Sequence, residues 1–518
     1  MNMSSPLHLK PLAACLAAAL AIVPAGALLA DPAHPLASPR PAHAIKRSHV
    51  AQLLATSSGL TRKGLSLRQV MEEAAASARA ARPAPADRPA GVVAVTSCDD
   101  AGPGTLRDAV ANAVSGDVVD LSGLSCSSIS LTTGAINVTV DSLSIQGPGA
   151  STLAIDAGGL SGVINHYGTD LLAIDGLTIA NGYTVGYAYH GGACVLSSAN
   201  IDISNSTLTH CYAYTAHAYG GAVCAVGNIT LSNTTLSGNT TKGHFYYYYL
   251  PGNPTPYLIN GTSFGGGAYA GGHVTISDST ITHNTAVQNN RGSVGGGVAS
   301  RLGGNLISGS TFDNNTAWIG GGIAALGPYS GDTGGVSVVN STISGNSTTN
   351  TSGGILTYRM TYTTLHNSTI TNNFAPYCGG AYVYYGETDI KSSIISGNRS
   401  TYASNQFGYY TAADFDIFSS DATVSGDHNL VMTTNTPLPA DTLTADPLLL
   451  PLADNGGPTL THAFDMTSVA LDAGSNPDNL DNDQRGAGFP RVTSAAADIG
   501  AYEAPGAASD VIFSDGFD

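Results

Sequence analysis

Between residues 170 and 400, one short pattern of apolar and polar positions recurs eight times along the chain. Each repeat centres on an apolar residue and has a second apolar residue five positions earlier. The central residues are Ile179, Leu208, Leu236, Ile281, Phe312, Ile343, Ile370 and Ile395. Successive central residues are 25 to 45 positions apart. Repeats in this range of lengths, built from short apolar segments, are typical of solenoids, in which each repeat forms one coil and buries its apolar face against its neighbours.

Asparagine and glycine mark the corners of the predicted coils. The last six repeats have Asn three positions after the centre. These residues are Asn239, Asn284, Asn315, Asn346, Asn373 and Asn398. Because stacked coils place equivalent residues above one another, we expect a buried ladder of Asn side-chain amides. A Gly-Gly pair, such as Gly321-Gly322, precedes the next strand and permits a tight corner. The sequence therefore predicts an all-β fold, a single-stranded right-handed parallel β-helix over residues 92–440.

Two helices and one insertion are expected beside the coils. Ser66 and Gln69 form a capping-box pattern, from which a helix runs towards Ala81. The segment 105–114 is amphipathic and suits a short N-terminal capping helix over the open first coil. The longest interval between repeats contains an insertion at 241–264, which has to loop out of the stack.

The first 27 residues have the pattern of a secretory signal peptide. Lys10 is followed by small apolar residues up to Ala30, and Ala25-Gly26-Ala27 fits a cleavage site. An Ala-, Pro- and Arg-rich linker then covers 28–91. We therefore predict a protein that is secreted or held at the cell surface. A retained membrane anchor is the alternative, but a spanning helix would normally lack the cleavage site and carry more strongly apolar residues than alanine. No later segment has the apolar length of a membrane-spanning helix.

Charge narrows the range of partners. The formal net charge is −17, and 8 basic but 30 acidic residues follow Arg107. Binding to phosphates requires a basic face, so nucleic acid is not an expected partner. We expect a monomer without an integral membrane segment after the signal peptide is removed.

Six cysteines remain after the predicted cleavage, and export permits disulfides. We predict a bond between Cys98 and Cys126, which would tie the cap segment to the first strands. Counted from the preceding Gly-Gly step, Cys194 points outward and Cys224 inward, so bonding of these two would need a bulge. Cys211 and Cys378 lie several coils apart, too far to bridge in a regular stack.

The strand after each Gly-Gly step suggests a binding surface. Positions one and three after the step should point into the core, and position four outward. Arg301, Tyr358 and Tyr384 then align on the outer face, with Tyr382 beside them. Exposed aromatic rings on a rigid ladder can stack on sugar rings, so these four residues are the candidate glycan-binding site. The simpler interpretation is that tyrosines merely cover a β-sheet, where they are favoured.

Three parts of the chain carry a family resemblance. The Gly-Gly-Ala/Ile and Ser-Thr-Ile-x-x-Asn pattern over 170–400 resembles polymorphic outer-membrane-protein repeats of the pectate-lyase-like superfold. The segment 98–110 is similar to the N-terminal cap of secreted bacterial β-helix proteins. Motifs at 446–503, among them Asp454-Asn455-Gly456-Gly457-Pro458-Thr459, resemble the choice-of-anchor Q region, which we place at 441–505 before a tail at 506–518. The resemblance implies the fold and export, and it supplies no catalytic residues.

The acidic residues do not indicate a catalytic site or a clear metal-binding site. Asp478, Asp481 and Asp483 could bind calcium, but their spacing is not that of a known calcium loop, and a structural turn is the simpler interpretation. No Cys or His set has metal-ligand spacing, so no metal or other cofactor is expected. Carboxylates and basic residues in the coils fall at different repeat positions, so they do not form a catalytic set.

We therefore expect a non-catalytic binding or adhesion scaffold for polysaccharide or a host or cell surface. The alternative is a polysaccharide lyase or glycoside hydrolase on the same fold.

Overall fold

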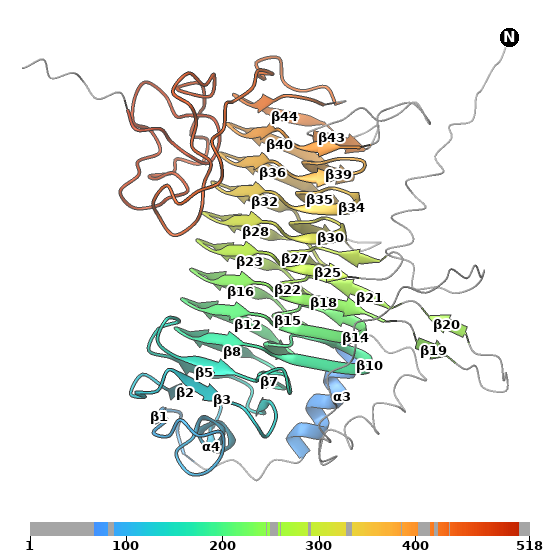
Figure 1. Cartoon of the computed structure of the whole chain (residues 1–518), viewed down its shortest axis with the longest axis vertical. Helices are drawn as coiled ribbons and strands as arrows, with labels where there is room; N and C mark the ends of the chain where they lie inside the picture. The colour runs from blue at the N-terminus through green and yellow to red at the C-terminus, as the bar shows by residue number, and fades with distance from the viewer. Residues whose placement is uncertain are drawn as a thin grey trace, which may run out of the picture.

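The protein is an all-β parallel solenoid of about 10 turns, seen in a computed structural model of the chain (Figure 1). The structure describes residues 67–80, 88–244, 246–248, 257–259, 261–287, 292–327, 334–384, 386–401, 415–418, 423–434 and 436–506. The predicted signal peptide, most of the linker and the tail after residue 506 lie outside this range. Each complete coil runs through four parallel sheets, which we name A, B, D and C in the order in which the chain meets them.

Sheets A and B follow one another around a short corner in every coil. Sheet A contains β1 (Val92–Ala94), β2 (Asp117–Asp120), β5 (Leu143–Gln146), β8 (Leu171–Asp175), β12 (Asn200–Ser204), β16 (Ile229–Ser232), β23 (Val274–Ser277), β28 (Asn305–Ser308), β32 (Val336–Val339), β36 (Tyr362–His366), β40 (Glu387–Lys391) and β44 (Val424–Asp427). Sheet B contains β3 (Ser128–Ser130), β6 (Ala154–Asp156), β9 (Thr178–Ala180), β13 (Thr207–Thr209), β17 (Thr235–Ser237), β24 (Thr280–Thr282), β29 (Thr311–Asp313), β33 (Thr342–Ser344), β37 (Thr369–Thr371), β41 (Ile394–Ser396) and β45 (Leu430–Val431).

Sheets D and C complete the coil. Sheet D contains β10 (Tyr183–Gly191), β14 (Tyr212–Tyr219), β18 (Thr240–Gly243), β21 (Thr262–Phe264), β25 (Thr285–Val287), β26 (Ser293–Val294), β30 (Thr316–Ile319), β34 (Ser347–Thr351), β38 (Phe374–Ala375) and β42 (Arg399–Ser400). Sheet C contains β4 (Ile136–Val138), β7 (Ile164–His166), β11 (Val195–Ser197), β15 (Val223–Ala225), β22 (Ala268–Ala270), β27 (Val298–Ser300), β31 (Ile323–Leu326), β35 (Ile355–Tyr358), β39 (Ala381–Tyr384) and β43 (Phe415–Phe418).

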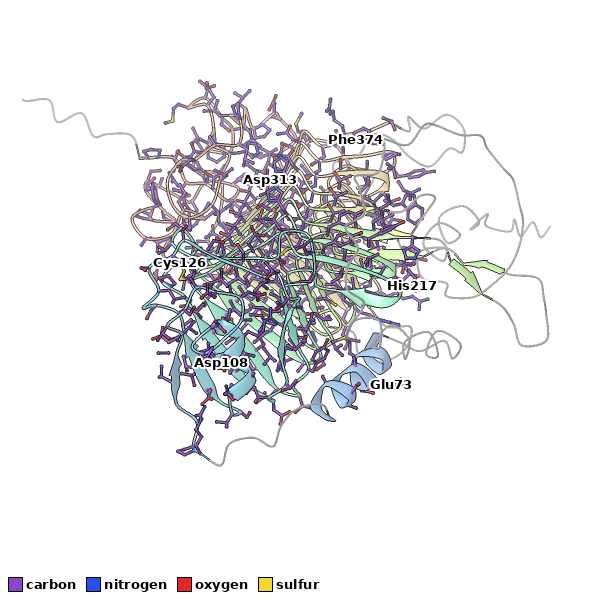
Figure 2. All side chains as sticks on the ribbon, turned by 60° about the horizontal axis from the view of Figure 1, so that its bottom comes forward. Glu73, Asp108, Cys126, His217, Asp313 and Phe374 are labelled. Atoms are coloured by element: carbon purple, nitrogen blue, oxygen red, sulfur yellow. A yellow bond between two sulfur atoms is a disulfide. The ribbon has the colours of Figure 1, made fainter. Side chains whose placement is uncertain are left out.

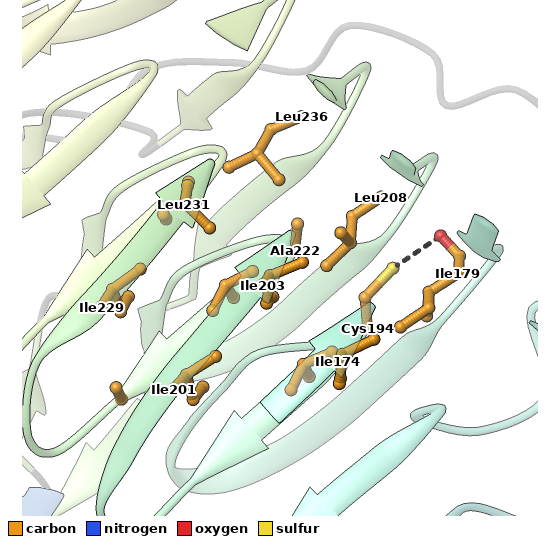
Figure 3. Packing of buried hydrophobic residues seen from close by; sticks show 14 of the residues in the cluster. Ile174, Ile179, Cys194, Ile201, Ile203, Leu208, Ala222, Ile229, Leu231 and Leu236 are labelled. Carbon is orange, nitrogen blue, oxygen red and sulfur yellow. Dashed lines mark hydrogen bonds between the residues drawn. The ribbon is translucent and has the colours of Figure 1, made fainter. Parts of the chain in front are cut away.

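The repeat register predicted from the sequence is confirmed. All eight central residues pair with one another in sheet B, from Ile179 opposite Leu208 to Ile370 opposite Ile395. All eight are fully buried in the main core, whose packing is shown in Figure 3. The insertion loops out as predicted, and its strands β19 (Tyr246–Tyr248) and β20 (Tyr257–Ile259) form an antiparallel pair beside sheet D.

The predicted asparagine ladder is present at the corner between sheets B and D. The Nδ2 of Asn239 donates to Oδ1 of Asn284 at 3.0 Å, and the same bond links each further pair along the ladder down to Asn398. The first five members are fully buried and Asn398 is half-buried. Each amide also donates to a backbone carbonyl, so the ladder satisfies corner groups that would otherwise lie unpaired inside the coil.

Both predicted helices are present. Helix α4 (Leu106–Asn112) begins after Thr105, whose side chain caps the helix by accepting from the Asp108 backbone N–H, and its apolar face joins the main core. Helix α3 (Leu67–Ala80) lies across the outer face of sheet C, where Met71 is 1% exposed among Leu196, Cys224 and Tyr269. Neither described helix is long and apolar enough to cross a membrane.

The C-terminal region, residues 436–506, has almost no regular strands and packs against the last coils (Figure 1). Its apolar residues Phe464, Ile499 and Tyr502 bury a small core with Ile394 and Leu430 of the last two strands of sheet B. This region therefore covers the outer face of sheet B at the C-terminal end of the solenoid and leaves the earlier coils uncovered.

Candidate ligand-binding surface

The tyrosines predicted to bind glycans are in the predicted register, but they are buried. Leu326, Tyr358 and Tyr384 are paired in sheet C, and the two tyrosine rings stack with centroids 4.8 Å apart. Tyr358 is 7% exposed, Tyr384 9% and Tyr382 only 1%. The prediction that these rings form an exposed strip is therefore wrong.

A second core outside the coil buries these rings. It also contains Val294 and Ile319, which end their strands in sheet D just before the glycine step. Gly295 and Gly320 have φ of 68° and 61°, a backbone conformation that L side chains rarely adopt. The chain thus doubles back at each step and lays the end of sheet D over the outer face of sheet C. Sequence periodicity locates the strands but not this reversal, and for that reason the position-four residues were expected to be exposed.

Arg301, the fourth predicted member, lies apart from the tyrosine pair. It is exposed just after β27, and its guanidinium interacts with the Tyr269 hydroxyl. Burial raises the pKa of Tyr269 to about 12, partly offset by the charge of Arg301. The structure does not bring Arg301 together with Tyr358, Tyr382 and Tyr384.

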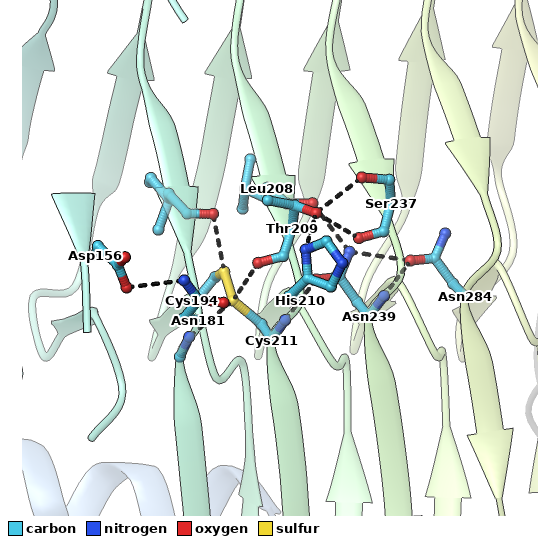
Figure 4. Close-up of a disulfide and its surroundings, with 12 residues drawn as sticks. Asp156, Asn181, Cys194, Leu208, Thr209, His210, Cys211, Ser237, Asn239 and Asn284 are labelled. Atoms are coloured by element: carbon cyan, nitrogen blue, oxygen red, sulfur yellow. Dashed lines mark hydrogen bonds between the residues drawn. A yellow bond between two sulfur atoms is a disulfide. The ribbon is translucent and has the colours of Figure 1, made fainter. Parts of the chain in front are cut away.

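Two disulfides are present, one of them not predicted. Cys98 and Cys126 are bonded as expected, and Cys194 is bonded to Cys211 within the main core (Figure 4). The predicted orientations of Cys194 and Cys224 are wrong. Ala222 occupies the place that Gly267 holds in the next coil, so counting from Gly220-Gly221 shifts the register by one residue. Cys224 consequently points outward and is buried beneath helix α3.

A different group of tyrosines is accessible, on the outer face of sheet D. Burial alternates over the first four residues of β14, so that Tyr212 and Tyr214 are half-exposed and Ala213 points into the core. Tyr183 pairs with Tyr212 in the previous coil, and the two rings are parallel within 5° with centroids 5.8 Å apart. The Tyr214 ring lies 6.2 Å from that of Tyr212. We call Tyr183, Tyr212 and Tyr214 the tyrosine platform.

The platform continues along the sheet as a row of uncharged polar side chains. In register with Tyr212 lie half-exposed residues from successive coils. They are Thr240, Thr285, Thr316, Ser347 and Phe374 (Figure 2 labels Phe374). In the neighbouring row, Val185 is 56% exposed and Lys242 lies 5.6 Å from the centroid of the Tyr214 ring. The face is therefore aromatic at the N-terminal coils and hydroxyl-rich beyond them.

Charge is distributed unevenly among the sheets. None of the described strands of sheet D contains Asp or Glu, although the chain has 36 acidic residues, and Lys242 and Arg399 are its cations. The outer face of sheet A, by contrast, carries Asp175, Asp202 and Asp389. The described strands of sheet D therefore offer a ligand a face without carboxylates, unlike the strands of sheet A.

Burial favours the neutral forms of four titratable groups around the platform, Tyr183, Tyr212, His217 and His244. Burial raises the pKa of Tyr183 and Tyr212, so their hydroxyls remain protonated and can donate hydrogen bonds. Burial lowers the pKa of His217, labelled in Figure 2, to about 4, and that of His244, whose ring lies 4.9 Å from Tyr214, is also lowered. The platform therefore offers aromatic rings and hydroxyls, with the Lys242 ammonium beside the Tyr214 ring.

The tyrosine platform is not among the predicted binding residues, although the spacing of its tyrosines follows the repeat. Tyr183 and Tyr212 are separated by 29 residues, as are Ile179 and Leu208, so the tyrosines occupy equivalent positions in successive coils. The segment between the corner Asn and the glycine step forms sheet D, a strand that the repeat pattern does not mark.

The acidic residues considered for calcium do not converge. Asp483 is buried and paired with Arg485 at 2.5 Å, while Asp478 accepts a hydrogen bond from His366 at the surface of sheet A. His366 also contacts Asp389 at 3.1 Å, and Asp389 is paired with Lys391. Within the described ranges, no group of three His, Cys, Asp or Glu side chains is arranged to hold a metal ion. These carboxylates are therefore paired with neighbouring basic side chains.

Comparison of the chain with protein-family models, with curated proteins and with solved structures finds no match.

Proposed function

We propose that this protein is an exported, non-catalytic scaffold that binds polysaccharide chains through the tyrosine platform on sheet D. The stacked, half-exposed pair Tyr183 and Tyr212 is the observation that carries the proposal. Two aromatic rings held in register on a rigid sheet present an apolar surface with little conformational entropy to lose on binding.

The chemistry of sheet D suits a sugar chain better than other polymers. Sugar rings combine apolar C–H faces with many hydroxyls, and the platform combines aromatic rings with hydroxyl donors and acceptors. Successive coils repeat at about 4.8 Å, which is similar to the length of one pyranose unit in an extended chain. A polymer lying along the solenoid axis can therefore repeat the same contact on each coil.

Export is part of the proposal. Two disulfides are expected in an oxidising compartment and are rare in the cytosol. The signal-peptide pattern at 1–27 supports the same location. The resemblance of the coils to polymorphic outer-membrane-protein repeats, and of 441–505 to the choice-of-anchor Q region, fits a secreted or cell-surface protein of the pectate-lyase-like superfold.

A glycan array probed with the purified mature chain tests the proposal. We expect binding to one class of extended polysaccharide. The same preparation incubated with acidic polysaccharides, with and without calcium, should release no unsaturated or reducing products. Absence of binding to every glycan would contradict the scaffold. Product release that is lost when Asp389 or His366 is substituted would instead establish the lyase or glycoside hydrolase alternative.

A further inference from the structure

A row of threonines crosses the outer face of sheet B in exact register. Each member is the first residue of its strand and pairs with the next member in the following coil. The row comprises Thr178, Thr207, Thr235, Thr280, Thr311, Thr342 and Thr369. We call it the threonine row. Because the strands are parallel, the hydroxyls recur at the coil spacing of about 4.8 Å.

The C-terminal region occupies one end of the threonine row. The Thr311 hydroxyl donates to the Leu460 carbonyl at 2.6 Å, and the Thr342 hydroxyl donates to Oε1 of Gln484 at 2.6 Å. The Thr369 hydroxyl accepts from the backbone N–H of Ala501 at 3.0 Å. All three threonines are buried. These hydroxyls therefore both donate to and accept from a polar chain that runs across the coils.

The middle of the row has the same geometry but no such cover. Thr207, Thr235 and Thr280 are half-exposed, and none of their hydroxyls is hydrogen-bonded within the part of the chain that the structure describes. The adjacent row is different, because Thr209 and Ser237 hydrogen-bond to each other at 3.0 Å (Figure 4). The three hydroxyls of the threonine row are therefore the ones available to a ligand.

Polar corners flank this uncovered section on both sides, and the corner before Thr280 carries the exposed carboxylate of Asp278. On the sheet A side, Asn233 donates to Oδ1 of Asn205 at 2.9 Å, and both side chains are exposed. On the sheet D side, the imidazoles of His210 and His283 are exposed. Amide, hydroxyl and imidazole groups on a flat surface match the many hydroxyls of a neutral sugar chain.

We propose that Thr207, Thr235 and Thr280 form a second binding site, separate from the tyrosine platform, for a neutral polysaccharide chain lying along the solenoid axis. The occupied end of the row shows how a polar chain satisfies these hydroxyls, and the uncovered section continues the same surface. The ligand class rests on the proposed function, but the residues and the face of the solenoid are different. One chain on each face gives two bound chains per protein.

Isothermal titration with cellohexaose, a neutral β-linked probe, tests this site. The variant T207V/T235V/T280V removes three hydroxyls and keeps β-branched side chains, so the fold should persist. The matched control T230V/T275V/T364V changes three half-exposed threonines on the outer face of sheet A. We expect two bound chains for the unchanged protein and the control, and one for the sheet B variant. A Y183A/Y212A variant should also bind one chain, through the threonine row.

The outcomes separate the two sites. Unchanged stoichiometry and affinity in T207V/T235V/T280V would overturn the threonine-row site and leave the platform standing. Loss of one chain in that variant, with no change in Y183A/Y212A, would confirm the row and contradict the platform. No binding by the unchanged protein would overturn both sites. If the protein instead shaped growing ice crystals and T207V/T235V/T280V did not, the occupant would be ordered water, and the glycan assignment would be overturned.

Discussion

The side-chain amide of Asn315 donates a 2.9 Å hydrogen bond to Oδ1 of Asn346, and both residues are fully buried. Asn346 in turn donates to the Phe312 carbonyl and to Asn373, and its Oδ1 also accepts from the backbone N–H of Asn315. One side chain thus links three coils.

Replacing Asn346 by Leu should therefore lower the free energy of unfolding by about 1 to 3 kcal/mol, because buried backbone and amide groups lose their partners. Urea denaturation followed by circular dichroism measures the change. The control T349L, at an exposed position of β34, should change stability by less than about 0.5 kcal/mol. A melting curve of N346L identical to that of the unchanged protein would show that the ladder contributes nothing to stability.

Tyr384 is buried in the second core on sheet C, so its removal should affect stability, whereas the removal of a tyrosine from an exposed strip should not. Y384A should destabilise the protein by about 3 kcal/mol, because a buried aromatic side chain leaves a cavity when it is removed. Tyr362, which is 47% exposed on sheet A, provides the control, and Y362A should have little effect. Equal stability of Y384A and Y362A in chemical denaturation would mean that the Tyr358 and Tyr384 rings do face solvent.

Particular residues show how far the sequence predicts this structure. Asn346 and Ile343 were placed correctly because a solenoid repeats the same environment in each coil, so a pattern read along the chain becomes contacts across coils. Tyr384 and Cys224 were misplaced because their surroundings depend on the backbone reversal at the glycine step and on a helix distant in sequence. Periodicity records which residues share a position, but it does not record what later packs over that position.

Glu503 should make the C-terminal region sensitive to pH. Burial, together with the negative charge of Asp498, raises the pKa of Glu503 to about 7 from an ordinary value of 4.5. A raised folded-state pKa contributes stability that is fully present below pH 4.5 and is lost as the pH rises through about 7. We therefore expect stability to fall between pH 5 and pH 8.

The variant E503Q isolates this contribution, because His462, whose pKa is lowered by burial, acts in the opposite direction. The difference in unfolding free energy between the unchanged protein and E503Q should change across pH 5 to 8. The unchanged protein should lose more stability than the variant as the pH rises. Parallel pH profiles for the two proteins would show that Glu503 does not titrate in this range.

The most direct test of the tyrosine platform is the affinity of Y183A/Y212A for the polysaccharide identified on the array. We expect the dissociation constant of the platform site, measured by isothermal titration, to rise at least about tenfold, which corresponds to about 1.4 kcal/mol and matches the loss of two aromatic contacts. The control Y362A, which removes an exposed tyrosine from sheet A, should bind as the unchanged protein does. If Y183A/Y212A folds normally and binds with unchanged affinity at every site, the tyrosine platform is not the glycan-binding surface.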